Sequence, residues 1–128
     1  SITGASVACA IAFDRMVAEG ALKTSPLTGH VSAVSCGVYE DVAILDLCYL
    51  EDRDARVDFN IVMTEDTAFV ELQGSGEEAT FSSEEMSTML ELGRKGISEI
   101  SELQRQAVVA ALGDSDKDAA QRLAEHFN

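Results

Sequence analysis

The sequence predicts an α+β fold: a helix, then a four-stranded, mostly antiparallel sheet, then a long C-terminal helix packed on that sheet. Three observations predict it. A helical, apolar pattern opens the chain, β-rich segments follow between residues 31 and 73, and a capping motif then begins a long amphipathic segment. With 46% hydrophobic residues, the chain can bury a core. We expect residues 1–113 to form one domain and residues 114–128 a weakly helical or frayed tail.

The first expected helix spans about Ser1–Glu19. Ser1 or Thr3 offers a hydroxyl group for its N-cap, and Gly20 is a typical stop signal. The run Val7–Phe13 is apolar at every position, and a helix that is apolar all round must be buried on all sides. We therefore expect this helix to need packing partners outside the given sequence.

Four segments have the composition and spacing of β-strands. The third alternates most clearly, with Phe59, Ile61 and Met63 on one face and Asp58 on the other. Short turns between the segments predict an antiparallel meander, and the run Gly74–Gly76 is expected to end the sheet. The expected strands are Val31–Val38, Val42–Leu50, Asp58–Thr64 and Ala68–Gln73.

The long helix is expected to begin at a capping box, in which Ser82 and Glu85 stand three residues apart. Its apolar positions recur at helical spacing as far as about Leu112. Gly93 and Gly96 interrupt this face. We expect them to allow close packing of the helix on the sheet.

Charge argues against a nucleic-acid partner for this segment alone. The formal net charge is −14, and the stretch Glu40–Glu91 contains fifteen acidic residues but only Arg53 and Arg56 as basic ones. Nucleic-acid binding usually depends on a basic surface. Two explanations would reconcile this charge with nucleic-acid binding: clustered carboxylates can hold a divalent cation, or the basic surface can lie on a part of the protein outside this sequence.

Cysteine use and hydropathy indicate a cytoplasmic protein. Cys9, Cys36 and Cys48 are odd in number, form no C-x-x-C pair and have apolar neighbours. We interpret them as buried free thiols of a reducing compartment. No apolar run approaches the ~20 residues of a membrane span, and no signal peptide is recognisable, so we expect no membrane partner.

The segment that offers chemistry is residues 49–60. Four carboxylates fall within eight of its residues, where one expected strand ends and the next begins. Carboxylates that converge there could bind Mg²⁺ through their oxygens, and one could serve as a general acid or base. A solvated acidic loop is the plainer alternative, and the pattern alone leaves both open. The four are Glu51, Asp52, Asp54 and Asp58, and Asn60 projects to the same face as Asp58.

Other candidate sites have weaker signals. The run Ser1–Gly4 has the small and hydroxyl residues of a helix N-terminus, which can bind phosphate through free backbone N–H groups, although an ordinary cap explains it more simply. His30 and His126 are isolated from each other and from any cysteine pair, which argues against a zinc site or histidine-based catalysis. Neither a P-loop nor a G-x-G-x-x-G motif is present.

Taken together, stretches from residue 1 to about residue 112 resemble the ribonuclease PH family in one register. The most specific part is Y-x-E-D at residues 49–52 followed by D-x-N-I-V-M-T at residues 58–64. The loop after the fourth strand departs from the family pattern, with Glu78 in place of glycine and Thr80 in place of proline. The matching stretches are Ser1–Ala5, Leu22–Pro26, Val31–Val38, Asp46–Asp52, Val57–Thr64, Val70–Gly74 and Phe81–Glu85.

The resemblance implies that the chain is the C-terminal half of a ribonuclease PH-type domain. This family removes 3′ nucleotides from tRNA precursors by attack of inorganic phosphate, the co-substrate, and releases nucleoside diphosphates. Its two active-site aspartates fall on Asp52 and Asp58, which would hold Mg²⁺ or Mn²⁺ or supply a general acid. Ser1 follows the family's phosphate-binding run and becomes a candidate phosphate contact. Secondary candidates are Glu51, Asp54 and Asn60.

The partners that the resemblance implies are an RNA 3′ end, the N-terminal half of the same domain, and further copies in a homohexameric ring. The N-terminal half would supply an RNA- and phosphate-binding arginine, so this chain alone is expected to be inactive. Two alternatives stay open. One is a non-catalytic ring subunit or assembly module of an RNA-degrading complex, against which the intact Asp52 and Asp58 argue. The other is a plain carboxylate-rich cation-binding domain.

Overall fold

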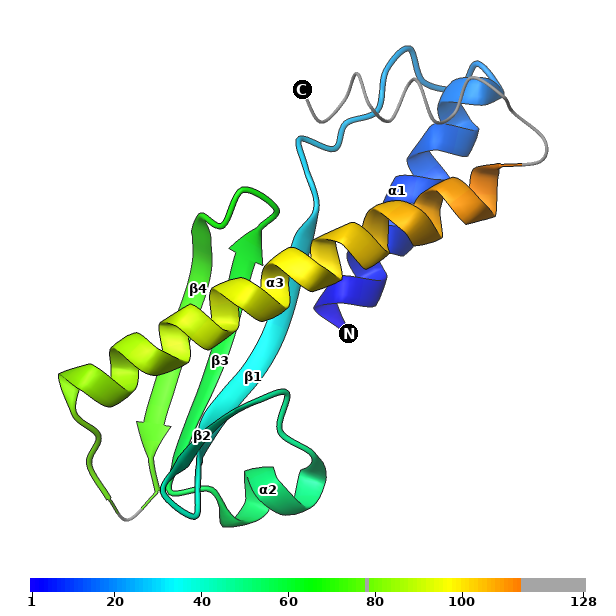
Figure 1. The fold of residues 1–128 in the computed structure, drawn as a ribbon. Coiled ribbons are helices and arrows are strands. Elements are labelled where there is room, and N and C mark those ends of the chain that lie inside the picture. The colour runs from blue at the N-terminus through cyan, green and yellow to red at the C-terminus, as the bar shows by residue number, and fades with distance from the viewer. Residues whose placement is uncertain (78, 114–128) are drawn as a thin grey trace.

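The computed structural model describes residues 1–77 and 79–113. Its elements are α1 (Ile2–Ala18), β1 (Val31–Tyr39), β2 (Val42–Leu45), α2 (Tyr49–Asp54), β3 (Val57–Thr64), β4 (Phe69–Gly76) and α3 (Ser83–Leu112). Helix α3 crosses one face of the sheet, and α1 lies beside the C-terminal part of α3 (Figure 1). The predicted α+β class is confirmed, while the predicted tail at 114–128 lies outside the described residues.

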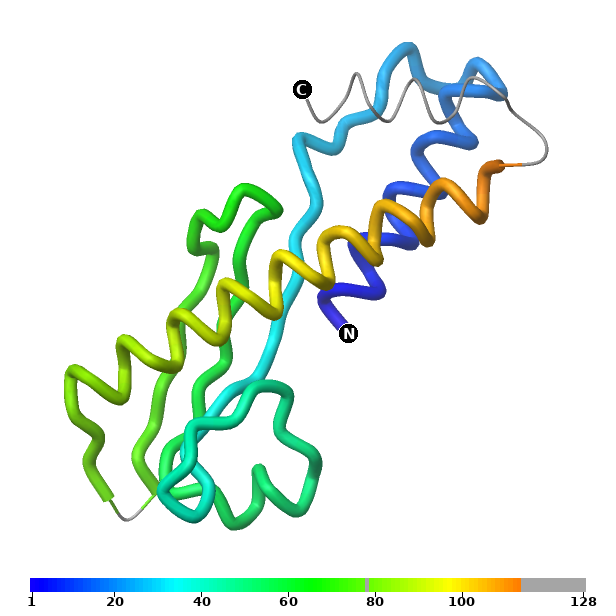
Figure 2. Tube along the Cα trace, viewed as in Figure 1, coloured from blue at the N-terminus to red at the C-terminus, as the bar shows by residue number. Residues whose placement is uncertain are grey.

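The sheet has the order β2-β1-β3-β4, with all neighbours antiparallel. The predicted meander is therefore wrong, because β3 pairs with β1 and not with β2. The connection between β2 and β3 contains α2, which makes it long enough to pass from one side of β1 to the other (Figure 2). Strands β1 and β3 pair along eight residues, from Val31↔Thr64 to Val38↔Val57, and form the centre of the sheet.

The hydrophobic core lies between α3 and one face of the sheet. Phe59, Ile61 and Met63 of β3 are at most 2% exposed, and they belong to one buried cluster with Met89 and Ile97 of α3. This burial confirms the predicted alternation along β3. The opposite face of the same strand carries Asp58 and Asn60.

Glycines let three segments approach one another closely in this core. A Cβ on Gly93 would lie 2.4 Å from Cδ1 of Ile61, which confirms the predicted role of the α3 glycines. A Cβ on Gly74 would lie 2.5 Å from Cζ of Phe59. The run Gly74–Gly76 is the last part of β4, so the prediction that it ends the sheet is wrong. Gly74 is a glycine in a strand because a side chain there would collide with the Phe59 ring.

Helix α1 covers the part of the β1 edge that β2 leaves unpaired. Successive residues of a strand direct their backbone groups to opposite edges. At this edge the Ala33 N–H donates to Thr3 Oγ1 at 3.1 Å, and the Val31 N–H donates to Ser6 Oγ at 3.2 Å. The side-chain amide of Gln104 on α3 donates to the carbonyls of Thr3 and Val31, both at 3.0 Å. Three side chains thus take the place of a neighbouring strand.

The predicted burial of α1 on all sides does not occur within residues 1–77 and 79–113. Ala10 is its one buried residue, and it lies in a small cluster with Val108 and Leu112 of α3. Ile2 and Met16 are exposed, because only one side of α1 meets α3 and β1. The expected packing partner outside the sequence stays a prediction.

The predicted strand Val42–Leu50 ends early, because the chain turns at Asp46 and then forms α2. Asp46 has a left-handed φ of 61°. The Glu51 carboxylate accepts a hydrogen bond from the Cys48 N–H at 2.7 Å, which closes the first turn of α2. The acidic residues 51–54 therefore lie on a short helix and not at a strand end.

The three cysteines are free thiols, as predicted, but only Cys36 is buried. Its Sγ donates to the Met89 carbonyl at 3.5 Å, and burial, with the charge of Asp58, raises the pKa of the Cys36 thiol to about 11. Cys9 and Cys48 are exposed, contrary to the prediction, because apolar neighbours in the sequence do not decide which side of a helix is covered. Among the described residues, no helix is long and apolar enough to cross a membrane.

Candidate active site

Asp58 lies near the start of the central strand β3, on the face turned away from α3. In the sheet it faces Gly37 of β1 and Ser75 of β4, so neither neighbour places a large side chain over it. Its Oδ1 is buried and has no hydrogen-bond partner within residues 1–77 and 79–113. A buried carboxylate oxygen without a partner is costly, and such groups are typical of functional sites.

Asp52 reaches the same region from helix α2. The helix ends at Asp54, and two residues later the Arg56 N–H donates to the Val38 carbonyl at 2.8 Å, so the chain enters β3 almost directly. Asp52 is exposed, and its negative charge helps to raise the pKa of Asp58. In the structure, the two aspartates that the sequence singled out are therefore close enough to interact electrostatically.

The pKa of Asp58 is raised above its ordinary value by three causes. Burial contributes most, the charge of Asp52 comes next, and the charge of Glu77 follows. All three disfavour the ionised carboxylate. A raised pKa brings a carboxyl group closer to the range in which it can act as a general acid or base. A cation bound nearby would instead offset the repulsion and favour the ionised form.

Glu77 is a carboxylate near Asp58 that sequence analysis missed as a site residue. Its N–H donates to the Arg56 carbonyl at 3.0 Å, which continues the β3–β4 pairing one residue beyond Val57↔Gly76. In this register Glu77 lies diagonally across from Asp58, within reach of a long side chain. The glycine-rich run before it is typical of a sheet end, so the sequence offers no signal for this cross-strand relation.

Local structure explains two of the three secondary candidates. The Glu51 carboxylate is engaged in the first turn of α2. Asp54 forms an ion pair with Arg53 at 2.6 Å, and the hydrogen bond from Arg53 lowers the pKa of Asp54. Asn60 is exposed on the same face of β3 as Asp58, so it stays a candidate for contact with a substrate.

Ser1 lies at the N-terminus of α1, beside a different part of β1. It is the N-cap of α1, although its side chain makes no capping hydrogen bond. Its neighbour Thr3 is bonded to Ala33, four residues along β1 from the Gly37 that faces Asp58. At ~3.3 Å per residue this separation is about 13 Å along the strand. Ser1 is therefore no close neighbour of the aspartates, and its phosphate contact stays a prediction.

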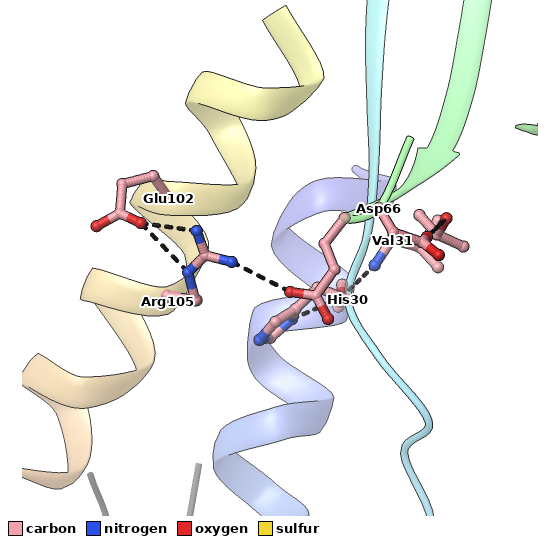
Figure 3. Close-up of polar contacts among 8 residues, drawn as sticks. His30, Val31, Asp66, Glu102 and Arg105 are labelled. Carbon is pink, nitrogen blue, oxygen red and sulfur yellow. Dashed lines mark hydrogen bonds and ion pairs between the residues drawn. The ribbon is translucent and has the colours of Figure 1, made fainter. Parts of the chain in front are cut away.

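His30 is buried where α1, the start of β1 and α3 meet (Figure 3). Its Nδ1 lies 3.2 Å from Ser6 Oγ. Next to it, Arg105 of α3 pairs with Glu65 at 3.3 Å and with Glu102 at 2.8 Å. Burial lowers the pKa of His30, and it outweighs the raising effect of Glu65. These contacts are those of a structural histidine, while His126 lies outside the described residues.

The two aspartates fit a hard divalent cation. Mg²⁺ and Mn²⁺ prefer oxygen ligands, and Asp58 Oδ1 is a buried carboxylate oxygen that no described group satisfies. Within the described part of the chain, no three His, Cys, Asp or Glu side chains form a complete metal site. A cation held by Asp52 and Asp58 would therefore take its other ligands from water or from phosphate oxygens.

Comparison with known proteins reveals close relatives. Residues 29–96 match the family model for the 3′ exoribonuclease family, domain 2. Ribonuclease PH of Bacillus subtilis is 47% identical over 116 residues, which cover 90% of this chain and 46% of the relative. Ribonuclease PH of Halalkalibacterium halodurans is 48% identical over 118 residues, which cover 91% of this chain and 46% of the relative. The chain thus spans about half the length of the curated relatives that it matches.

The fold also has a counterpart among solved structures. The crystal structure of rice Rrp46 matches with a TM-score of 0.56 and 26% sequence identity, over 65% of this chain and 39% of that chain. The family model covers more than half of the chain, and the ribonuclease PH relatives cover nearly all of it. From the sheet, its helices and these matches, we conclude that the chain belongs to the 3′ exoribonuclease family and corresponds to the C-terminal half of a ribonuclease PH domain.

Proposed function

We propose that this chain is the acid-bearing half of a phosphate-dependent 3′–5′ exoribonuclease that trims tRNA precursors. The observation that supports this most is the buried, unsatisfied oxygen of Asp58 beside the charges of Asp52 and Glu77. A proton or a divalent cation would satisfy that oxygen, and both assist attack at a phosphodiester. The ribonuclease PH names of the relatives support the same reaction.

In the proposed reaction, an oxygen of inorganic phosphate forms a bond to the phosphorus of the last nucleotide. The bond from this phosphorus to the 3′ oxygen of the preceding nucleotide breaks, and a nucleoside diphosphate leaves. In its protonated form, Asp58 would donate a proton to the departing 3′ oxygen. In its ionised form, Asp58 would instead hold Mg²⁺ or Mn²⁺ together with Asp52, and the cation would offset the negative charge of the reacting phosphates and of the departing 3′ oxygen.

The N-terminal half of the same domain supplies, in this proposal, the basic surface that RNA and phosphate require. A net charge of −14 opposes RNA binding by this chain alone. The exposed apolar residues Ile2 and Met16 of α1 and Leu72 of β4 support a further protein surface against this chain. We expect the completed domains to form a hexameric ring. The exposed free thiols Cys9 and Cys48 suit a reducing cytoplasm.

The test is an RNA 3′-end degradation assay with and without phosphate, on this chain combined with the N-terminal half. Nucleoside diphosphates are expected only with phosphate, and Asp58→Asn should slow their release about 10²- to 10⁴-fold. Glu91→Gln on the exposed side of α3 removes one negative charge elsewhere and should keep full activity. Release without phosphate, or an active Asp58→Asn variant, would contradict the proposal.

The second candidate is a non-catalytic ring subunit or assembly module, for which the fold similarity to rice Rrp46 is the supporting observation. It predicts that this chain joins a ring-sized complex without turnover. Gel filtration together with the degradation assay separates the two candidates. A ring that releases no nucleoside diphosphate would favour the assembly module.

A further inference from the structure

Helix α2 exposes an aromatic side chain next to the proposed acid site. Tyr49, the first residue of α2, is 77% exposed, more than any other large exposed hydrophobic residue described. Three phenylalanine rings have such partners: Phe59 and Phe81 pack edge to face with centroids 5.1 Å apart, and the Arg94 guanidinium lies 5.5 Å from the centroid of Phe69. Tyr49 has no ring or cation partner of this kind within the described residues, so packing does not explain it.

Helical spacing puts Tyr49 on the same face of α2 as Asp52. Residues three apart in an α-helix are surface neighbours, with Cβ atoms about 5–6 Å apart. Among the charges that raise the pKa of Asp58 on β3, that of Asp52 has the largest effect. The Tyr49 ring therefore lies on the side of α2 that carries Asp52, next to the carboxylates at which the phosphodiester is proposed to react.

The first turn of α2 holds the Tyr49 backbone in place. On one side, the Cys48 N–H donates to Glu51 Oε2 at 2.7 Å. Across the same turn, the Asp52 N–H donates to the Cys48 carbonyl at 2.8 Å. A ring carried by a preformed turn loses less conformational freedom on binding than a ring on a loop, and this lowers the cost of binding.

We propose that Tyr49 is a substrate-binding residue on which an RNA base next to the scissile phosphodiester stacks. Every base has a π-face, so stacking tolerates any sequence, as removal of successive nucleotides requires. An uncharged ring also adds affinity for RNA where the surrounding carboxylates repel its phosphates. The inference rests on the proposed exoribonuclease function and adds to it a contact with the base.

The experiment compares Tyr49→Ala and Tyr49→Phe in the complex of this chain with the N-terminal half. Single-stranded RNA is used with all bases present, or with the base removed from the last or the penultimate nucleotide. Tyr49→Ala should weaken binding of intact RNA about 5- to 150-fold and act mainly on KM. Tyr49→Phe keeps the ring and should stay close to wild type. One of the two abasic RNAs lacks the base that stacks on Tyr49. Wild type, Tyr49→Ala and Tyr49→Phe should bind this RNA with equal affinity.

Three outcomes would overturn the stacking role. The first is that Tyr49→Ala binds intact RNA as tightly as wild type. The second is that Tyr49→Ala loses the same factor in affinity on intact RNA and on both abasic RNAs, because a double-mutant cycle would then show no coupling between the ring and a base. The third is a complex that dissociates in Tyr49→Ala but not in Tyr49→Phe, which would assign the ring to a subunit interface. A wild-type complex without turnover would count against the exoribonuclease itself, whereas an active wild type with an unaffected Tyr49→Ala would remove only this inference.

Discussion

The two faces of the sheet differ sharply although the same strands build both. Toward α3, Phe59 and Ile61 are almost completely buried in an apolar cluster. On the other face, Asp58 and Asn60 alternate with them in the same strand, and Asp58 carries a buried oxygen without a described partner. The period of two along β3 therefore separates the residues that stabilise the fold from the residues proposed to react, although they are adjacent in sequence.

The largest expected effect on stability comes from removing an aromatic ring from the face of the sheet that packs against α3. Phe59→Ala leaves a cavity against Phe81 and Gly74 and should lower the free energy of unfolding by about 3–5 kcal/mol. Urea denaturation followed by circular dichroism measures it. Phe69→Ala is the matched control, because Phe69 is 43% exposed on the edge strand β4, and its loss should be much smaller. Equal losses for the two would contradict the assignment of the core.

The same substitution at two helical glycines should have opposite effects. A Cβ on Gly93 would lie 2.4 Å from Cδ1 of Ile61, so Gly93→Ala should cost about 1–3 kcal/mol through overpacking. Gly4 in α1 has nothing within 4 Å of its Cβ position, and Gly4→Ala should stabilise by about 0.5–1 kcal/mol. Thermal unfolding of both variants tests this, and a stabilised Gly93→Ala would show that α3 sits farther from the sheet.

The free energy of unfolding should depend on pH through His30, which is buried where α1, β1 and α3 meet. Burial lowers the pKa of His30 below its ordinary 6.5, so the unfolded chain binds a proton at a higher pH than the folded chain. Stability should therefore fall as pH drops below about 6.5, by at most about 1.4 kcal/mol per pH unit, until the folded-state pKa is passed. Unfolding free energies at pH 7 and pH 5.5 measure the slope. His30→Gln should flatten it, and an unchanged slope in that variant would assign it to other groups.

The smallest effect on stability is expected on the face of the sheet that is turned away from α3. The folded-state pKa of Asp58 is raised above 3.8, so ionisation of Asp58 destabilises the fold as pH rises through that pKa. Asp58→Asn carries no charge and should unfold at a slightly higher temperature than wild type at pH 7, with no difference near pH 3. The effect stays small because Asp58 is only half-buried. A variant that unfolds at a lower temperature at pH 7 would mean that the carboxylate has a stabilising partner.

The packed face could be predicted from the sequence because its signals are local. Alternation of Phe59, Ile61 and Met63 identifies the buried side of β3. The capping box is equally local, and in the structure Ser82 Oγ accepts from the Glu85 N–H at 3.1 Å. Each signal depends on residues within one strand or one helical turn.

The parts that could not be predicted depend on contacts between distant segments or on unusual local chemistry. Glu77 comes near Asp58 only through the β3–β4 register. Helix α2 closes its first turn with Cys48 where Ser, Thr, Asp or Asn is usual, so its start has no clear signal. The exposure of Cys9 depends on which side of α1 meets α3.

The hydrogen bonds from Gln104 can form only late in the synthesis of the chain. The Gln104 amide joins the carbonyl of Thr3, 101 residues earlier, to that of Val31. At about 5–20 residues per second, roughly 5–20 s pass on the ribosome between Thr3 and Gln104. During that time Thr3 and Ser6 can already contact the edge of β1, but the two hydrogen bonds from Gln104 of α3 cannot yet form. The nascent protein therefore carries an incompletely covered strand edge until nearly the whole described chain has been made.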